Sequence, residues 1–248
     1  MATEKCFILL SGGVDSTTAI AIAKNDFPEA DMEAVTIDYG QRHAKEIEAA
    51  ANVCKHYDIP HVVIPVKGLM EGMLVDKADN EAVPDVSYAD LPQGISPTYV
   101  TFRNGLMLSI LAARAQAWVM ANQKAILEGT VEGTTVSEAY QPNAYIYCGI
   151  HADDGANWAY PDCTIEFAGP MAAAIYVGTY NRVRLRTPFT FMSKTLLVSL
   201  GLGLDVPYEL TWSCYKGEEK HCGTCPTCRS RKEAFEILGA KDPTRYAV

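Results

Sequence analysis

The chain has 248 residues, of which 48% are hydrophobic and 21% are charged, and its formal net charge is −9. This length suits one large α/β domain, or one with a small appendage, and leaves enough apolar residues for a sizeable core. The acidic balance disfavours a tight, non-specific nucleic-acid binder, since such proteins are usually basic, and favours a small-molecule substrate.

The chain shows no sign of export or membrane insertion. It has no apolar run long enough to cross a bilayer, and its first residues lead directly into a strand-like segment. Eight cysteines without a secretory signal favour a reducing compartment, where cysteines bind metals or stay free. We therefore expect a cytoplasmic protein without membrane contact, in which Cys6 and Cys54 are buried core thiols.

The most informative stretch is a strand–turn–helix unit at residues 5–25. Residues 5–10 are an apolar run of strand type, and residues 19–25 combine helix formers with an apolar stripe. Gly12 and Gly13 let a ligand approach the main chain, and the unpaired N–H groups at the helix start favour an anion. The predicted phosphate cradle comprises Leu10, Ser11, Gly12, Gly13, Val14, Asp15, Ser16, Thr17 and Thr18.

This turn is not a Walker A loop, because the pattern G-x-x-x-x-G-K-[ST] is absent and no lysine lies in the turn. It resembles the SGGxDS signature of the PP-loop ATP pyrophosphatases, which split ATP into AMP and pyrophosphate. That resemblance assigns Asp15 to the loop and to the Mg²⁺–triphosphate environment. The simpler alternative is a Ser/Gly-rich turn in which Asp15 caps the helix.

Strand-like and helix-like segments alternate after this unit. Residues 33–40 and 61–66 are apolar strand candidates, and residues 43–58 predict a helix between them. The alternation predicts an α/β fold with a parallel sheet covered by helices, in which ligands bind beyond the carboxyl ends of the strands. The segment 38–43 follows a strand, as the loop does, so we add Asp38, Gln41 and Arg42 to the nucleotide site. For Gln41 and Arg42, the alternative is a solvent-exposed position at the start of a helix.

The middle of the chain holds a long irregular segment and a strongly apolar helix. Residues 67–98 predict a loop with one helical turn, which is either a lid or a surface excursion. Residues 105–121 predict the helix, and Arg103 near its start can reach a phosphate or carboxylate. We expect strands at 124–130, 144–152 and 183–189, a hairpin or excursion between the first two, and a further helix that opens at Lys194.

The tail carries cysteines in a C-x7-C-x2-C-x2-C pattern, at Cys214, Cys222, Cys225 and Cys228. Two successive C-x2-C steps form tight turns that direct thiolates to one point, and the upstream cysteine completes a tetrahedral, structural zinc site. An iron–sulfur cluster, a redox C-x-x-C pair and disulfides are the alternatives. Zinc is favoured because nothing else in the chain indicates electron transfer.

The motifs together resemble one family. The loop at 11–16 is followed by DYGQRH at 38–43, by T-Y-V-x-x-R-N ending at Asn104, by Y-P-D-C at 160–163 and by the cysteine tail. This combination extends over nearly the whole chain and is similar to the QueC family of 7-cyano-7-deazaguanine synthases. SGGxDS alone would indicate only the superfamily.

The resemblance implies a ligase that forms carbon–nitrogen bonds. It converts 7-carboxy-7-deazaguanine and ammonia to the nitrile, through an adenylated carboxylate, an amide and a second ATP-dependent activation that removes water. The implied catalytic residues are Asp15, Lys194 and Arg103, and the implied cofactors are ATP, Mg²⁺ and Zn²⁺. The resemblance also implies a homodimer.

Recognition of the substrate can be argued from its ring. A guanine-like ring offers an N1–H and an exocyclic amine side by side, and one carboxylate accepts both. Asp162 is the first candidate for this role and Glu166 the second; as an alternative, Asp162 caps the helix that follows it. Tyr160 or Tyr39 can stack on the ring. For His151, the alternative to substrate binding is a buried position in the core. The expected substrate site comprises Tyr39, Arg103, Asn104, His151, Tyr160, Asp162 and Glu166.

Two features depart from the family pattern. Thr101 and Phe102 stand where the family usually has a proline and a small residue, and the stretch 124–143 is longer than expected. A relative that stops at the amide, or passes the activated acyl group to another amine, would carry almost the same motifs. Both products therefore stay open at this point.

Two other classes of protein compete with this reading. A tRNA thiolase or a lysidine synthetase would show basic surfaces, which the net charge of −9 disfavours. A thiolase would also use a catalytic cysteine pair, which the cluster of four cysteines disfavours. A non-catalytic zinc-ribbon binding module would not need the intact SGG loop. We expect a Rossmann-like PP-loop domain over 1–205 and a small zinc-binding region over 206–248 packed on it, with small-molecule partners and no nucleic acid.

Overall fold

The computed structural model describes residues 3–41, 44–75, 83–90, 94–128 and 141–248. These residues contain one sheet of five parallel strands in the order β3-β2-β1-β4-β5. The strands are β1 (Glu4–Leu9), β2 (Asp31–Asp38), β3 (His61–Pro65), β4 (Asn143–Tyr147) and β5 (Val183–Arg186). The predicted parallel-sheet α/β fold is confirmed.

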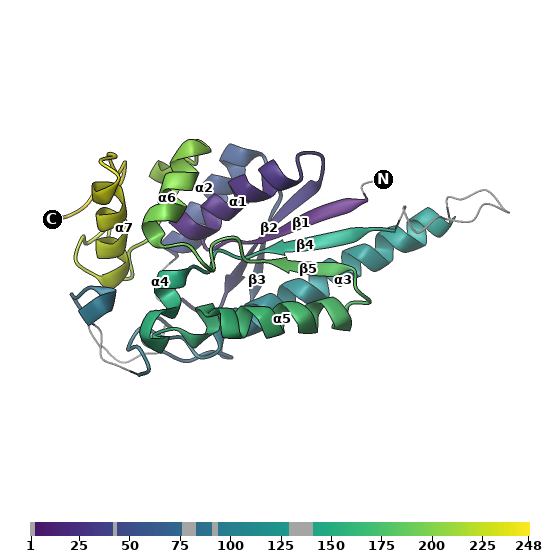
Figure 1. Ribbon diagram of the computed structural model, residues 1–248, viewed down its shortest axis with the longest axis horizontal. Coiled ribbons are helices and arrows are strands. Elements are labelled where there is room, and N and C mark those ends of the chain that lie inside the picture. The colour runs from purple at the N-terminus through teal and green to yellow at the C-terminus, as the bar shows by residue number, and fades with distance from the viewer. Residues whose placement is uncertain (1–2, 42–43, 76–82, 91–93, 129–140) are drawn as a thin grey trace.

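Helices cover both faces of the sheet (Figure 1). One face carries α1 (Val14–Asp26), α2 (Lys45–Tyr57) and α6 (Lys194–Gly203), and the other carries α3 (Arg103–Glu128) and α5 (Ile165–Gly178). Beyond the carboxyl ends of the strands lie α4 (Ala152–Gly155) and α7 (Pro226–Ile237), and α7 packs on α6. Four 3₁₀ turns complete the described elements, at Tyr88–Asp90, Ala156–Trp158, Pro161–Cys163 and Tyr208–Leu210.

The apolar run of β1 is explained by burial on both sides. Phe7 and Leu9 belong to the core under α3 and α5, whereas Cys6, Ile8 and Leu10 belong to the core under α1, α2 and α6. Successive side chains of a strand point to opposite faces, so a central parallel strand is apolar throughout. The first strand of the chain thereby joins the two hydrophobic cores.

Most predicted elements are found, and one is wrong. Residues 124–128, which we expected to begin a strand, continue α3 to Glu128. They are helix formers without a turn signal before them, so the helix extends past 121. The irregular segment at 67–98 contains the expected single helical turn, and most of the excursion before β4, residues 129–140, lies outside the described residues.

Two other predictions concern thiols and membranes. Cys6 and Cys54 are both buried, as expected of core thiols. Among the helices of the described residues, none has the length and apolar character needed to span a bilayer.

The C-terminal tail is attached through a buried arginine. Arg231 of α7 is fully buried, and its guanidinium donates to the Asp242 carboxylate at 3.1 Å, to the Tyr208 carbonyl at 3.0 Å and to Thr211 Oγ1 at 2.7 Å. A buried charge is tolerated only when it is paired in this way. Because Tyr208 and Thr211 precede the cysteines, this contact holds α7 against the segment that leads into the cysteine cluster.

Candidate active site

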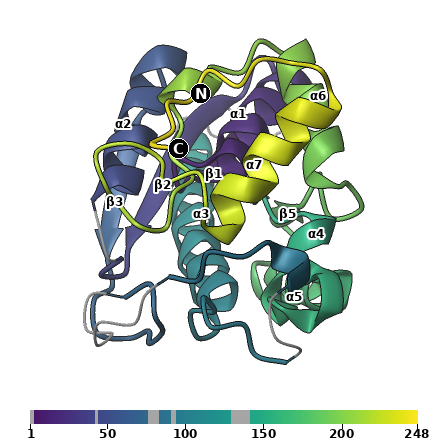
Figure 2. The ribbon, with the colours of Figure 1, turned by 90° about the vertical axis from the view of Figure 1, so that its left-hand side faces the viewer.

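A cleft opens at the carboxyl edge of the sheet. It lies where β1, β2 and β4 end and where α1, α2, α3 and α6 begin, and residues of the cysteine tail close one side. Figure 2 views the molecule from this end, with α7 in the foreground. The cleft encloses about 1100 Å³ of non-protein space, its open mouth included.

The SGG loop forms the floor of the cleft. Gly12 has a φ of +79°, and a Cβ there would lie 2.5 Å from the carbonyl oxygen of Glu46 and 2.6 Å from the amide nitrogen of Ala50. Only glycine accommodates both the backbone angle and this close approach of α2. Gly13 is the N-cap of α1 and no side chain caps that helix, so the first-turn N–H groups remain available to an anion.

The hydroxyls of the loop divide into two groups. Ser11 and Ser16 line the cleft, and their Oγ atoms lie 3.0 Å apart. Thr17 and Thr18 are fully buried inside α1 and do not line the cleft, and Thr18 donates to the Val14 carbonyl at 2.8 Å. The structure therefore directs only the serine hydroxyls of the predicted cradle toward a bound phosphate.

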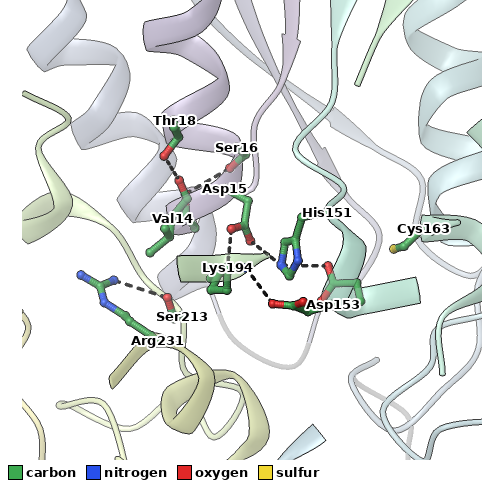
Figure 3. A network of polar contacts seen from close by, with 12 residues as sticks. Val14, Asp15, Ser16, Thr18, His151, Asp153, Cys163, Lys194, Ser213 and Arg231 are labelled. Atoms are coloured by element: carbon green, nitrogen blue, oxygen red, sulfur yellow. Dashed lines mark hydrogen bonds and ion pairs between the residues drawn. The ribbon is translucent and has the colours of Figure 1, made fainter. Parts of the chain in front are cut away.

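Asp15 and Lys194 form an ion pair across the cleft, joining the first turns of α1 and α6 (Figure 3). The backbone N–H of Lys194 donates to Asp153 at 2.7 Å, which fixes the start of α6. Burial opposes ionisation of Asp15, but Lys194 and His151 outweigh it and hold the pKa of this carboxyl below its usual value. Asp15 is therefore ionised and paired with Lys194, and it is not the cap of α1, whose N-cap is Gly13.

His151 lies beside this pair. Its Nε2 is 3.8 Å from the Asp15 carboxylate and 3.4 Å from that of Asp154, and the side chain is 2% exposed. Its Nδ1 has no hydrogen-bond partner among the described residues. His151 thus lines the cleft between two carboxylates and is not a histidine of the apolar core.

Arg103 enters the cleft from the opposite side, at the first residue of α3. Its guanidinium carbon lies 6.0 Å from the centre of the Tyr39 ring, and Nη1 is 3.5 Å from the Tyr39 hydroxyl.

Gln41 also lines the cleft, and its Oε1 accepts from the Tyr39 N–H at 3.1 Å. Asp38 does not line the cleft and pairs with Lys67 at 3.3 Å. The predicted Arg42 lies outside the described residues.

Asp162 has a different position from the one we expected. Its Oδ2 accepts from the backbone N–H of Asn104 at 2.9 Å, while Asn104 Nδ2 donates to the Asp162 carbonyl at 3.1 Å. Burial raises the pKa of this carboxyl, opposed by the Asn104 N–H and by Arg103. Asp162 therefore satisfies the first turn of α3, whereas α5 is capped by Thr164. It does not line the cleft.

Two further substrate candidates also lie elsewhere. The buried Tyr160 bonds through its hydroxyl to Thr98, and Glu166 is exposed on the first turn of α5; neither lines the cleft. The aromatic residues found there besides Tyr39 include Tyr88 and Tyr215, whose hydroxyls are 3.2 Å apart. No pattern in the sequence brings the segments of those two tyrosines to the sheet edge, and both were missed.

The four tail cysteines are buried and converge on one point. Their sulfur atoms lie within 4.8 Å of one another, and those of Cys222 and Cys228 are 3.9 Å apart. A tetrahedron with metal–sulfur bonds of about 2.3 Å has sulfur–sulfur edges of about 3.8 Å. Backbone N–H groups point at the sulfurs, such as those of Lys216 and Cys222 toward Cys214 Sγ, both at 3.4 Å. The cluster therefore has the composition and dimensions of a closed metal site.

Comparison with known proteins gives the family of this fold and site. A family model described as the queuosine biosynthesis protein QueC matches residues 5–135 and 134–239. The chain belongs to the QueC family. The SGG loop at the start of α1 and the parallel sheet give this QueC-family chain the fold of a PP-loop ATP pyrophosphatase.

Relatives match this chain over more than nine-tenths of their length. A 7-cyano-7-deazaguanine synthase of Thermoplasma volcanium is 35% identical over 250 residues, which cover 98% of this chain and 91% of the relative. One of Aliarcobacter butzleri is 37% identical over 252 residues, with 99% and 97% covered. Among solved structures, the U34-tRNA thiolase NcsA of Methanococcus maripaludis matches at 16% identity and a TM-score of 0.43, over 96% of this chain and 65% of that one. A similarity of that level supports no conclusion about this chain.

The departure from the QueC pattern at Thr101 and Phe102 leaves the cleft unobstructed. Phe102 has a φ of +46°, is 59% exposed and packs edge-on against Phe167 with ring centres 6.1 Å apart. Thr101 is tied to Glu71 by its N–H at 3.0 Å and its hydroxyl at 3.1 Å. Both residues lie directly before the start of α3, and neither lines the cleft.

The role of Asp162 can be tested by Asp162→Ala. The substitution leaves a buried N–H of α3 unpaired, so we expect the free energy of unfolding to fall by about 1–2 kcal/mol. Because Arg103 is held by this turn, kcat should fall together with stability, and Asp162→Asn, which keeps an acceptor oxygen, should restore most of both. Chemical denaturation and steady-state kinetics check this. Unchanged stability with a raised KM for the purine alone would mean that Asp162 contacts the substrate.

Proposed function

We propose that this QueC-family chain converts 7-carboxy-7-deazaguanine and ammonia to 7-cyano-7-deazaguanine, using ATP. The observation that carries the proposal is the placement of Lys194, Asp15 and Arg103 around one cleft beside the SGG loop. The relatives that bear the synthase name match this chain over more than nine-tenths of both lengths. The reaction makes the protein a ligase that forms carbon–nitrogen bonds, and we place it in the cytoplasm.

Activation of the carboxylate is the first task. A carboxylate resists attack by ammonia until one of its oxygens becomes part of a good leaving group, and transfer of AMP from ATP achieves this. The departing pyrophosphate requires positive charge, which the free N–H groups of α1 and the Lys194 ammonium supply. Magnesium bound to the triphosphate would neutralise further charge, and the ionised Asp15 is the carboxylate beside the loop that can hold it.

The nitrile requires this activation twice. In the first round ammonia displaces AMP from the acyl adenylate and leaves the amide. In the second round the amide oxygen is adenylated, and loss of AMP and of the nitrogen-bound protons leaves the carbon–nitrogen triple bond. Two ATP molecules are thus converted to two AMP and two pyrophosphate for each nitrile, and the same phosphate-binding residues serve both rounds. We include Leu10, Ser11, Gly12, Gly13, Val14, Ser16 and Gln41 in this nucleotide site, and Tyr39, Asn104 and His151 in the substrate site beside it.

We propose further that zinc occupies the four-cysteine site. Four thiolates with no open position match a structural Zn²⁺ site, and Arg229 and Lys232 nearby partly offset its negative charge. On this account residues 206–248 are the zinc-binding region, packed on a PP-loop domain formed by residues 1–205.

We also propose a homodimer that uses the outer face of α5. This helix has one charged residue, Glu166, yet only Ala168 and Ile175 of it are buried, and Val177 is 72% exposed. An apolar helix face of this kind is unusual on the surface of a monomer. Sedimentation at micromolar concentration tests the proposal: a dimer is expected, and a monomer contradicts it.

Mass spectrometry of the products tests the proposed reaction. We expect incubation with 7-carboxy-7-deazaguanine, ATP, Mg²⁺ and ammonium to yield the nitrile, with AMP and pyrophosphate. Lys194→Ala serves as the inactive control, because it removes the cation beside the loop. An amide that accumulates would show that the second activation is absent, and unaltered purine with intact ATP would contradict the proposed function.

The metal site is tested by Cys225→Ser together with metal analysis. We expect one zinc per wild-type chain, and we expect the variant to lose most of it and to unfold at a lower temperature, since the binding free energy of a structural zinc is part of the folding free energy. Cys54→Ser, which alters a buried thiol outside the cluster, is the matched control for metal content. Fully stable wild-type protein without metal would contradict the assignment.

A further inference from the structure

One carboxylate in the cleft has no partner within the part of the chain that the structure describes. Glu46 lies in the first turn of α2 and lines the cleft, and among the described residues no donor forms a hydrogen bond with its carboxylate. The close contact between Gly12 and the Glu46 carbonyl holds this turn directly against the SGG loop. The position of Glu46 beside the phosphate cradle is therefore built into the fold.

The surroundings of Glu46 are poorly suited to an isolated charge. Burial raises the pKa of Glu46 to about 7, and Arg103 across the cleft offsets this only in part. Glu46 is half-buried in the cleft wall, and a partly desolvated carboxylate without hydrogen bonds carries a free-energy cost that donors from a bound ligand can remove. The cleft thus presents an acceptor that a ligand with N–H groups would satisfy.

The other carboxylates that line the cleft already have partners. Asp15 is paired with Lys194, and Asp154 lies 3.4 Å from His151. The two carboxylates that we first considered for ring recognition are not available either, because Asp162 caps α3 and Glu166 is exposed on α5. Of the described carboxylates at the cleft, Glu46 alone has neither a hydrogen bond nor a cationic or imidazole group within ion-pair distance.

Arg103 and Glu46 together match one edge of guanine. An arginine side chain only donates and an ionised glutamate only accepts. The edge of a 7-deazaguanine presents an acceptor, O6, followed by two donors, N1–H and the 2-amino group. Two donors side by side fit the two oxygens of one carboxylate, and the adjacent carbonyl fits a guanidinium. The Tyr39 ring, which lies against Arg103, completes an aromatic wall for the purine.

We propose that Glu46 is the specificity-determining residue of the substrate site, accepting from N1–H and the 2-amino group while Arg103 donates to O6. The assignment rests on the proposed function and identifies the group in this cleft that selects a guanine-type ring. A ring without the 2-amino group leaves one oxygen of Glu46 unpaired, and an adenine-type edge sets a bare acceptor, N1, against a carboxylate. Both are rejected because of the cost of an unsatisfied polar group.

The experiment compares two ligands in four proteins. The ligands are 7-carboxy-7-deazaguanine and its analogue without the 2-amino group. The proteins are the wild type, Glu46→Ala, Glu46→Gln and Glu48→Gln. Glu48 lies in the same turn of α2 but is exposed and does not line this cleft, so its variant repeats the charge change without touching the site. Calorimetric titration gives the four pairs of dissociation constants, and ATP titration and thermal unfolding check that each variant is folded.

We expect the wild type and Glu48→Gln to prefer the aminated ligand by about 10- to 100-fold, the range of one charge-assisted hydrogen bond. In Glu46→Ala the preference should fall below about threefold while ATP affinity is retained. Glu46→Gln should also lose most of the preference for the aminated ligand, because its side-chain amide offers one acceptor oxygen for two donors. If Glu46→Ala does not fold, Glu46→Gln provides the test in its place.

Full discrimination in folded Glu46 variants would overturn the assignment and leave the proposed function intact. A wild type that binds ATP but neither purine would overturn the proposed function, and the assignment with it. These outcomes separate the two proposals.

Discussion

The active cleft depends on two backbone contacts that leave no room for a Cβ. At Gly12 the SGG loop meets the first turn of α2, and at Gly149 the end of β4 meets the first turn of α1, where a Cβ would lie 2.8 Å from Asp15 C and Ser16 N. These approaches bring the starts of α1 and α2 and the ends of β1 and β4 to one place. The side chains that follow them, Asp15, Glu46 and His151, converge because the backbones behind them touch.

Charge in the cleft is arranged in two parts. On the loop side, the ion pair of Asp15 and Lys194 and the contact of Asp153 with the Lys194 N–H fix a cation at the start of α6. On the purine side, Arg103 and Glu46 face one another without a hydrogen bond between them. The first part suits the phosphates of the ATP that we propose as a substrate. The second part, where the Glu46 carboxylate has no hydrogen bond among the described residues, suits the purine that we propose as the other substrate.

The sequence predicts the two parts of the site that are local in the chain. The SGG loop and the cysteine cluster are encoded within short stretches, so spacing alone shows which groups meet. Asp162 was assigned to the substrate because its motif is adjacent to a helix start, but it caps α3, whose N-terminus is 58 residues away in the chain. That contact depends on the packing of the short 3₁₀ turn against α3, which no local pattern encodes.

Glu46 was missed for the opposite reason. An acidic residue in the first turn of a helix is common, since it interacts favourably with the helix dipole, and nothing in the sequence separates it from Glu48. Only the structure shows that one of these side chains lines the cleft and the other is exposed. The strand expected at 124–130 shows a related limit, because α3 continues to Glu128 and the sequence before residue 124 has no turn signal that separates a new strand from the helix.

The most direct test of the account follows the oxygen atoms of the substrate. In 7-carboxy-7-deazaguanine labelled with ¹⁸O in both carboxyl positions, each activation should transfer one labelled oxygen to the phosphate of AMP. We predict that the two AMP molecules formed per nitrile each carry one ¹⁸O, as mass spectrometry would show, and that the nitrile carries none. Label in inorganic phosphate beside ADP, or label released to water while AMP stays unlabelled, would contradict activation by adenylation at the SGG loop.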